Sequence, residues 1–238
     1  MTTNQPSGCT ISQTILLFLL RRLIKLLLRL EITGLENIPT AGPVIIIINH
    51  IAFLDPLLVC AISPRLVIPL TKKEAFDSLL WRPILKLYGA IPVQRGEADT
   101  RAIKSTLQVL KQNGVILMAP EGTRSPTHQL QPAKEGAARV ALRSEAAIVP
   151  IGITGTHQIK AHWLKLKCAP VQLTVGQPFR LRLASANGRA HRAEMVAMTQ
   201  ELMYRLAQQL PPEFRGVYKH PEEVTEIYLV PAQNNAPS

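Results

Sequence analysis

The chain has few cysteines and few aromatic residues, and each shortage excludes a class of protein. Its 238 residues include three cysteines, Cys9, Cys60 and Cys168, which are odd in number, far apart and without metal-ligand spacing. They provide neither a disulfide framework nor a zinc site, so we expect a reducing compartment. Aromatic residues make up 5% of the sequence, which leaves few platforms for stacking the bases of single-stranded nucleic acid.

Acidic residues are also scarce, and the resulting charge indicates an anionic partner. The chain has 27 Lys and Arg against 16 Asp and Glu, a formal net charge of +11. So basic a protein meets nucleic acid, an anionic membrane surface or an anionic substrate. The sequence contains no Walker-type glycine–lysine loop, zinc pattern or nucleic-acid reading motif. We therefore expect no nucleic acid partner and no metal.

Residues 11–30 show a pattern typical of a helix that lies on a membrane surface. An apolar run at residues 15–20 precedes four cations whose spacing predicts one basic face: Arg21, Arg22, Lys25 and Arg29. These cations are too costly for a spanning helix, and they follow the apolar run, the reverse of a signal peptide. We expect an interfacial helix that associates the protein with an anionic membrane surface, on its cytoplasmic face. The alternative is an amphipathic helix packed on the protein's own core.

Apolar segments alternate with amphipathic ones, which predicts an α/β fold with a mixed sheet flanked by helices. We expect a short strand followed by turns over residues 31–43. Further strands are expected at residues 43–48, 66–70, 89–94, 115–118, 148–153 and 171–175, and helices at 56–62, 74–88, 97–112, 133–145 and 192–210. Pro83 would interrupt its helix, and Pro150 would push its strand to an edge or a bulge. The expected organisation is an N-terminal tail and interfacial helix at 1–33, one domain at 34–218 and a C-terminal tail at 219–238.

The most informative stretch is residues 42–58. Its run at 43–48 is nearly all apolar and β-branched, as in a strand buried on both faces, and it ends at Asn49 and His50. Functional groups of open α/β sheets gather outside the carboxyl ends of strands. A turn or helix after His50 can return Asp55 to the imidazole. A carboxylate on one ring nitrogen fixes the tautomer and leaves the other nitrogen as a base for a substrate hydroxyl. The alternative is an Asp that only caps a helix.

Two further strand ends carry groups that suit a phosphorylated substrate. In PEGTRSP, residues 120–126, Gly122 permits close approach of a ligand, Thr123 can donate a hydrogen bond, and Arg124 can grip a phosphate with two parallel hydrogen bonds. A simple β-turn is the alternative for this segment. In GAIPVQRG, residues 89–96, Arg95 follows a strand.

The sequence offers no good candidate for a covalent nucleophile. Cys60 lies in an apolar stretch and suits a small core residue, and no second histidine is placed beside Ser125. The other histidines lie in polar or loop-like surroundings, and we expect each to be solvated: His128, His157, His162, His191 and His220. Direct reaction of a deprotonated substrate hydroxyl needs no such nucleophile.

The blocks NH-x4-D, GAIPVQR, PEGTRS and VPIGI begin at Asn49, Gly89, Pro120 and Val149. In this order they resemble the 1-acylglycerol-3-phosphate O-acyltransferase (lysophosphatidate acyltransferase) family. The resemblance implies transfer of a fatty acyl group from acyl-CoA or acyl-carrier protein to the free hydroxyl of lysophosphatidate, which gives phosphatidate. It implies no cofactor beyond the acyl thioester donor.

The same resemblance implies roles for individual residues. His50 would be the general base and Asp55 would orient it. The acceptor site would consist of Arg95, Glu121, Gly122, Thr123 and Arg124, with the arginines on the phosphate and Lys72 adding charge. Residues 149–151 would shape the acyl pocket or support the site. Two departures from the family's pattern bear on the acceptor: Ala52 replaces a usual serine, and Ala119 replaces a common aromatic residue.

The sequence alone leaves three other functions open. An acyltransferase of the same fold could use glycerol 3-phosphate or another lysolipid as its acceptor. A non-catalytic lipid-binding protein would keep the fold and the basic helix, although it has no use for the His50/Asp55 pair. A nucleic-acid binder would use the positive charge and bind in a salt-sensitive way.

Overall fold

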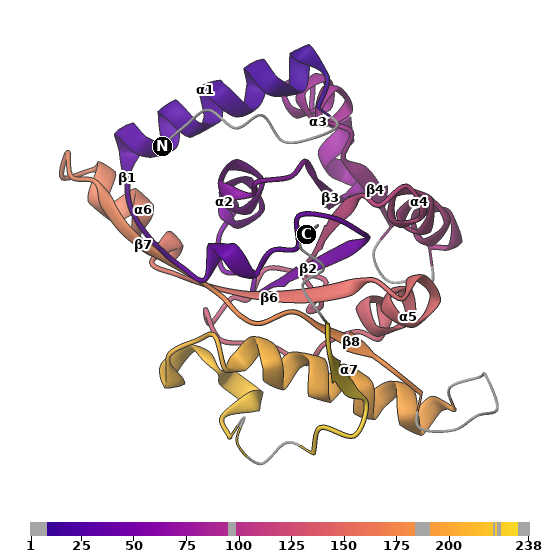
Figure 1. Cartoon of the computed structure of the whole chain (residues 1–238). Helices are drawn as coiled ribbons and strands as arrows, with labels where there is room; N and C mark the ends of the chain where they lie inside the picture. Colours follow the sequence, from indigo (N-terminus) through magenta and orange to yellow (C-terminus); the bar gives the residue numbers. More distant parts are fainter. Residues whose placement is uncertain (1–8, 95–98, 184–190, 221, 223–224, 233–238) are drawn as a thin grey trace.

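A mixed β-sheet with helices on both faces organises the chain (Figure 1). The computed structural model describes residues 9–94, 99–183, 191–220, 222 and 225–232, and over this part of the chain the sheet has nine strands. Seven of them follow the order β1-β7-β6-β2-β5-β3-β4, and β8 pairs with β6 and β9. The predicted α/β class, with a mixed sheet flanked by helices, is confirmed.

The strands that place the site run parallel at the centre of the sheet. Their bounds are β1 (Leu28–Thr33), β2 (Val44–Ile48), β3 (Val67–Lys72), β4 (Ile91–Val93), β5 (Val115–Met118), β6 (Ala147–Thr154), β7 (Ala169–Val175), β8 (Phe179–Leu181) and β9 (Leu229–Pro231). Strand β2 is parallel to both neighbours, with Ile46 opposite Leu117 of β5 and Val149 of β6. Strand β6 is antiparallel to β7 and β8.

Two layers of helices cover the sheet (Figure 1). One layer contains α1 (Ile11–Leu27), α2 (Asp55–Ile62), α3 (Trp81–Tyr88) and α6 (Ile159–Trp163), and the other contains α4 (Thr100–Lys111), α5 (Gly136–Ser144) and α7 (Arg192–Ala207). Short 3₁₀ segments lie at Leu35–Asn37, Lys73–Asp77, Thr156–Gln158, Pro212–Phe214 and Gly216–Tyr218.

The two hydrophobic cores explain why β2 is almost wholly apolar. Val44, Ile46 and Ile48 pack into the core beneath α1 and α2, while Ile45 and Ile47 pack into the core beneath α5 and α7. All five are at most 1% exposed, and burying each such side chain stabilises the fold by about 1.5–3 kcal/mol. The polar residues that follow β2 are therefore delivered to the edge of a rigid strand.

The first strand of the sheet begins earlier than the sequence predicted, and its last strand was not predicted. The first helix stops at Leu27 instead of continuing to residue 30, and Leu28–Thr33 forms β1 on β7. Strand β9 falls within the predicted C-terminal tail and pairs with β8. Pro83 lies in the first turn of α3, so the predicted interruption falls before this helix. The short strand expected from residue 31 therefore exists but begins three residues earlier. Local sequence did not reveal β9, whose partner β8 is very short.

The prediction that Pro150 marks an edge strand or a bulge is wrong. Strand β6 lies inside the sheet, between β7 and β2. On the side away from β2, the pairing with β7 stops at Ile151 and the pairing with β8 is at Ile148, so Pro150 faces the gap between them. Its carbonyl accepts a hydrogen bond of 2.8 Å from Gly176 on this side. Because N and C=O of one residue point to the same side of a strand, the missing N–H removes no ladder bond.

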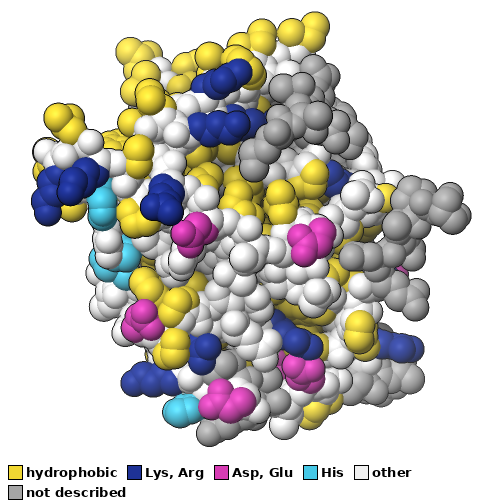
Figure 2. Space-filling model, turned by 60° about the vertical axis from the view of Figure 1, so that its left-hand side comes forward, with side chains coloured by type: hydrophobic (Ala, Val, Ile, Leu, Met, Phe, Trp, Pro, Cys, Tyr) yellow, Lys and Arg dark blue, Asp and Glu magenta, His cyan; other side chains and the backbone are white. Residues whose placement is uncertain are grey.

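Helix α1 has one face on the core and an apolar face in solvent. Leu17 and Ile24 are buried, whereas Ile15, Leu19 and Leu26 are 56%, 59% and 71% exposed. One face of α1 therefore packs on the protein's own core, as the alternative interpretation stated. The hypothesis of membrane contact applies to its other, exposed face. Hydrophobic side chains protrude along the upper rim of the face shown in Figure 2. Within the described residues, no helix is both long and apolar enough to cross a bilayer.

The prediction of four cations along one helical face is wrong. Arg21 turns inward, and its guanidinium donates to the carbonyls of Ala61, at 2.7 Å, and Ser63, at 3.5 Å. These carbonyls lie at the end of α2, where a cation complements the helix dipole. Arg29 belongs to β1. Arg22 and Lys25 remain exposed on α1.

Candidate active site

The carboxyl ends of the parallel strands meet at one edge of the sheet, and the functional side chains gather there. His50 follows β2, Gly122 follows β5, Thr156 follows β6, and Lys72 ends β3. This edge is where open α/β sheets bind ligands. The four positions come from segments that are distant in the sequence, so the sheet itself assembles the site.

His50 and Asp55 form the dyad that their spacing suggested. Nδ1 of His50 lies 3.1 Å from Oδ2 of Asp55. Asp55 begins α2 and is fully buried, and the same oxygen accepts hydrogen bonds from the backbone N–H of Ile51, at 2.7 Å, and Ala52, at 2.6 Å. A carboxylate has no proton to donate, so Nδ1 is the donor and Nε2 is left free. The His50 side chain is 14% exposed and lines a cavity.

Thr156 completes the hydrogen bonding of the buried carboxylate, and the sequence did not reveal it. Its hydroxyl donates to Oδ1 of Asp55 at 2.6 Å, and its side chain is buried. The two residues are 101 positions apart. The available signal was that Thr156 follows the carboxyl end of a strand. Because neighbouring parallel strands end at the same edge of the sheet, a residue at this position can lie close to Asp55.

Asn49 fixes the position from which His50 leaves the strand. Its side-chain amide donates to the carbonyl of Ile153 and its side-chain oxygen accepts from the N–H of Ile153, both at 2.8 Å. This pair of bonds continues the pairing of β2 with β6 one residue beyond the strand. Asn49 is buried and therefore has a structural role.

The turn at residues 120–126 holds the backbone of His50 from both sides. Glu121 accepts a hydrogen bond from the N–H of His50 at 3.1 Å, and Ser125 donates its own N–H to the carbonyl of His50 at 2.7 Å. The second oxygen of Glu121 accepts from the N–H of Gln131 at 2.9 Å. Glu121 is buried and absent from the cavity wall, so it supports the site from beneath instead of lining it as predicted.

Burial changes the protonation of Glu121. Loss of solvent and, to a lesser extent, the nearby Asp55 charge raise the pKa of its carboxyl, and the two N–H donors oppose the rise. Together these effects place the pKa at about 7. The carboxyl that accepts the backbone N–H of His50 therefore titrates near neutral pH.

Lys134 is a second residue that sequence reasoning missed. Gly122 has a φ of +73°, and a Cβ there would lie 3.2 Å from Cδ of Lys134. The glycine thus lets the lysine side chain cross the turn closely, and its left-handed backbone suits glycine. Both residues line the cavity. Among the described residues Lys134 makes no ion pair, whereas Lys72 lies 3.6 Å from Glu74.

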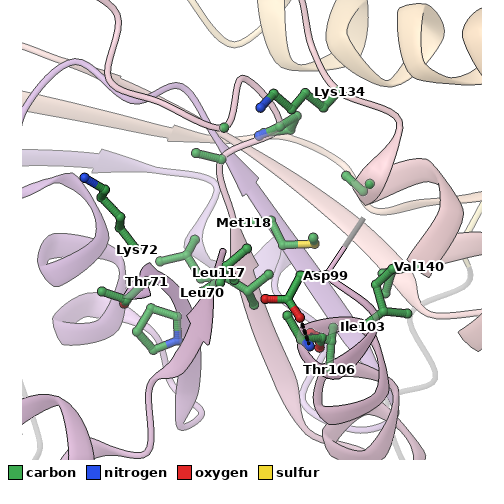
Figure 3. Close-up of a pocket in the computed structure, with 18 of the residues that line it drawn as sticks. Leu70, Thr71, Lys72, Asp99, Ile103, Thr106, Leu117, Met118, Lys134 and Val140 are labelled. Carbon is green, nitrogen blue, oxygen red and sulfur yellow. Dashed lines mark hydrogen bonds between the residues drawn. The ribbon is translucent and has the colours of Figure 1, made fainter. Parts of the chain in front are cut away.

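The other predicted phosphate ligands are placed differently. Thr123 and Arg124 are exposed on the turn and do not belong to the cavity wall. Lys72 does line the cavity, and Figure 3 shows it at the left of the view, apart from Lys134 at the top. Arg95 lies outside the residues that the structure describes. The structure therefore brings His50, Gly122, Lys72 and Lys134 to one cavity.

The cavity beside His50 is about 320 Å³ in volume and is mainly apolar. Its wall includes Ile48, Leu70, Ile103, Leu117, Met118 and Val140, from strands on one side and from α4 and α5 on the other. Figure 3 shows Ile103, Thr106 and Val140 together at the end far from Lys72. Ala119 also lines the wall, so a small side chain stands where an aromatic one would fill space.

Two histidines behind the dyad are not solvated as predicted. The rings of His128 and His157 stack with centroids 4.5 Å apart, and Nδ1 of each is buried without a hydrogen-bond partner among the described residues. Burial and the neighbouring His128 lower the pKa of His157, while the Asp55 charge raises it. The ring of Phe214 packs against that of His157, with their centroids 5.9 Å apart, so the C-terminal segment supports this part of the site.

The candidates for a covalent nucleophile lie elsewhere or have other partners. Cys60 is buried in the core as predicted, and burial raises the pKa of its thiol to about 12. The Ser125 hydroxyl lies 3.3 Å from the hydroxyl of Thr127 and not beside an imidazole.

Comparisons with known proteins identify a family. A model of the Acyltransferase family matches residues 29–154. The 1-acyl-sn-glycerol-3-phosphate acyltransferase of Bacillus subtilis is 29% identical over 172 residues, which cover 72% of this chain and 83% of that protein. Those of Cocos nucifera and Limnanthes alba are 32% and 34% identical over 57% and 61% of this chain, which spans about half of their length, 46% and 52%.

The fold also has a counterpart among solved structures. The crystal structure of the 1-acyl-sn-glycerophosphate (LPA) acyltransferase PlsC from Thermotoga maritima superposes with a TM-score of 0.59, covering 80% of this chain and 77% of that chain. The sequence identity is 20%, so this likeness concerns the fold.

Proposed function

The chain belongs to the Acyltransferase family, and on that premise we propose that it moves a fatty acyl group from an acyl thioester to 1-acylglycerol 3-phosphate, giving phosphatidate. The observation that carries the proposal is the dyad at the mouth of an apolar cavity: Nδ1 of His50 is held by a buried carboxylate, and the residue faces a space large enough for a lipid chain. Relatives named for this reaction match most of the folded part of the chain.

The proposed chemistry needs one base and no covalent enzyme intermediate. Nε2 of His50 takes the proton of the acceptor hydroxyl while the oxygen attacks the thioester carbonyl carbon. The new ester bond forms, the C–S bond breaks, and the imidazolium returns its proton to the departing thiolate. Asp55 stays ionised, keeps the ring oriented and stabilises the imidazolium, as in other His/Asp pairs.

Two lysines at the cavity mouth suit the phosphate of the acceptor. Lys134 has no competing carboxylate among the described residues, and Lys72 is partly neutralised by Glu74. A charge-assisted hydrogen bond to phosphate is worth about 1.5–3 kcal/mol. We assign Lys134 the larger part of the phosphate binding, with Lys72 and the exposed Arg124 as further cations. The apolar wall would hold an acyl chain.

The proposed place of work is an anionic membrane surface, on its cytoplasmic face. The outward face of α1 exposes Ile15, Leu19 and Leu26, with Arg22 and Lys25 beside them. Apolar side chains can enter the acyl region while the cations meet lipid phosphates. This attachment would bring the edge of the sheet that carries His50 toward its lipid substrates.

The decisive experiment is acyl transfer by the purified full chain. Labelled lysophosphatidate with acyl-CoA, and separately with acyl-carrier protein, should yield phosphatidate. His50→Ala should slow product formation by about 10²–10⁴ while the protein stays folded by circular dichroism. Glycerol 3-phosphate and other lysolipids serve as competing acceptors, because Ala119 widens the cavity wall. Lipid binding without any acyl transfer would favour a non-catalytic lipid-binding protein and overturn the proposal.

A further inference from the structure

The turn that follows α6 exposes large apolar side chains. Trp163, Leu164 and Leu166 are 38%, 78% and 97% exposed. Three lysines lie among them, Lys160, Lys165 and Lys167, and residues 159–168 contain no acid. We call residues 160–167 the Trp163 turn. In the part of the chain that the structure describes, none of its lysines forms an ion pair.

The backbone of the Trp163 turn makes Leu166 an unexpected residue. Lys167 donates its N–H to the carbonyl of His162, and Leu166 donates to that of Trp163, both at 3.0 Å. This is the hydrogen-bonding pattern that ends a helix with one left-handed residue, normally glycine. Leu166 occupies that position with a φ of +53°. Glycine would fit with less strain, so folding does not account for a leucine here that is almost fully exposed.

The Trp163 turn is fastened to the end of α1. The indole N–H of Trp163 donates to the carbonyl of Leu27 at 3.2 Å, and Sγ of Cys168 donates to that of Leu26 at 3.5 Å. Figure 1 places this turn beside the C-terminal end of α1, at the edge of the sheet where β2 and β6 end. In Figure 2 the same face shows a rim of hydrophobic side chains at the top and a second projection, with Lys or Arg and hydrophobic side chains together, at the left.

From these observations we propose that the Trp163 turn is a second membrane-contact element, which inserts Trp163, Leu164 and Leu166 into an anionic lipid surface. Tryptophan suits the interface because its ring is apolar and its N–H is polar, and here that N–H is already satisfied by Leu27. Lys165 and Lys167 would meet lipid phosphates. The inference rests on the proposed function only in that α1 meets the same surface.

An anionic bilayer fits this surface better than an acidic protein such as an acyl carrier. Leu164 and Leu166 are mostly exposed, and their turn, with α1, borders the edge of the sheet that carries His50. Contacts on two sides of that edge fix the orientation of the protein, whereas α1 alone would let it roll about the helix axis. A protein partner is a separate outcome of the test below.

The first test separates stability from membrane binding. Leu166→Gly relieves the left-handed strain, so its unfolding midpoint should equal or exceed that of the wild type. Combined with Leu164→Asn, it should lower partition to vesicles of equal parts phosphatidylglycerol and phosphatidylcholine by about tenfold or more, because burying one leucine is worth more than a tenfold change. Val196→Asn on α7, which removes another exposed apolar side chain from the opposite layer, is the matched control and should bind like the wild type.

The second test observes the inserted residue directly. The chain has two tryptophans, so Trp81→Phe leaves Trp163 as the one reporter. Its fluorescence should shift to the blue on anionic vesicles and be quenched by brominated lipid. Replacing Lys160, Lys165 and Lys167 by glutamine should weaken binding to anionic vesicles by about fivefold per lysine and spare binding to neutral ones.

Three results would overturn the inference. The first is unchanged vesicle partition of the Leu164→Asn, Leu166→Gly double variant, and the second is no quenching of Trp163 fluorescence. The third is that the double variant loses binding to an acyl-carrier protein but still binds vesicles. Activity toward a short, water-soluble acceptor should not change in these variants. If the wild type lacks that activity while the vesicle effects appear, the proposed function fails and the membrane contact stands.

Discussion

Replacing Thr156 by valine should reveal how much the alignment of the dyad depends on a residue remote in the chain. Three donors converge on Oδ2 of Asp55, but Oδ1 is held by the Thr156 hydroxyl, at 2.6 Å. Valine has nearly the shape of threonine and therefore removes the hydrogen bond without opening a large cavity. The buried carboxylate would lose its partner on one oxygen.

The magnitude follows from the chemistry of this bond. A hydrogen bond to a charged, buried group is worth about 1.5–3 kcal/mol. If the loss appears in the orientation of Asp55, and hence of His50, kcat should fall by about tenfold to a hundredfold. The Michaelis constants should change little, because Thr156 does not line the cavity. If some of the lost free energy appears as a lower stability of the folded protein, the effect on kcat will be smaller.

The assay compares Thr156→Val with Thr156→Ser, which keeps the hydroxyl. Steady-state kinetics give kcat and the Michaelis constants, and urea titration gives the unfolding free energy. The serine variant should recover most of kcat. If Thr156→Val matches Thr156→Ser in both kcat and stability, the hydrogen bond from Thr156 to Oδ1 of Asp55 contributes nothing. The assignment of Thr156 as a positioning residue would then be refuted.

Three further perturbations test other parts of the site. His50→Ala should lower kcat by about 10²–10⁴ and Asp55→Asn by less, measured on protein that is folded by circular dichroism; activity within tenfold of the wild type would contradict the base. Lys134→Met should raise the Michaelis constant for the phosphorylated acceptor by about ten- to a hundredfold, Arg124→Ala should raise it by less, and the constant for the donor should change far less in both variants; an equal rise for donor and acceptor would argue against phosphate binding. Because burial raises the pKa of Glu121 from 4.5 to about 7, its stabilising contribution is complete below pH 4.5 and is lost as pH rises through 7. The unfolding free energy of the wild type, minus that of Glu121→Gln, should therefore fall by about 3 kcal/mol over this range, and no such slope would refute the raised pKa.

The sequence could predict those parts of the site that short-range chemistry determines. The run of apolar residues at 43–48 indicated a doubly covered strand, and the spacing of His50 and Asp55 allowed the carboxylate to return to the imidazole through the first turn of α2. Cys60 in an apolar stretch was correctly placed in the core. These features need only a strand, a turn and the helix that follows.

The residues that the sequence missed depend on contacts between distant segments. Thr156 reaches Asp55 because β2 and β6 end side by side, and Lys134 reaches the cavity because its side chain crosses Gly122. Arg21 looked like part of a lipid-facing row but turns to the end of α2, a helix whose position no local pattern reveals. Pro150 suggested an edge, yet it sits where one antiparallel partner ends and another begins.

The pairing of β1 with β7 has a consequence for the order in which the chain can fold. Glu31 and its partner Gln172 are 141 residues apart, and β1 pairs with β7 as its neighbour in the sheet. During synthesis β1 therefore waits without that partner until most of the chain has been made. Such long-range closure slows folding and leaves an open edge in the nascent protein. The outward face of α1 emerges before β7, so a lipid surface that covers it would shield this part of the chain through this interval.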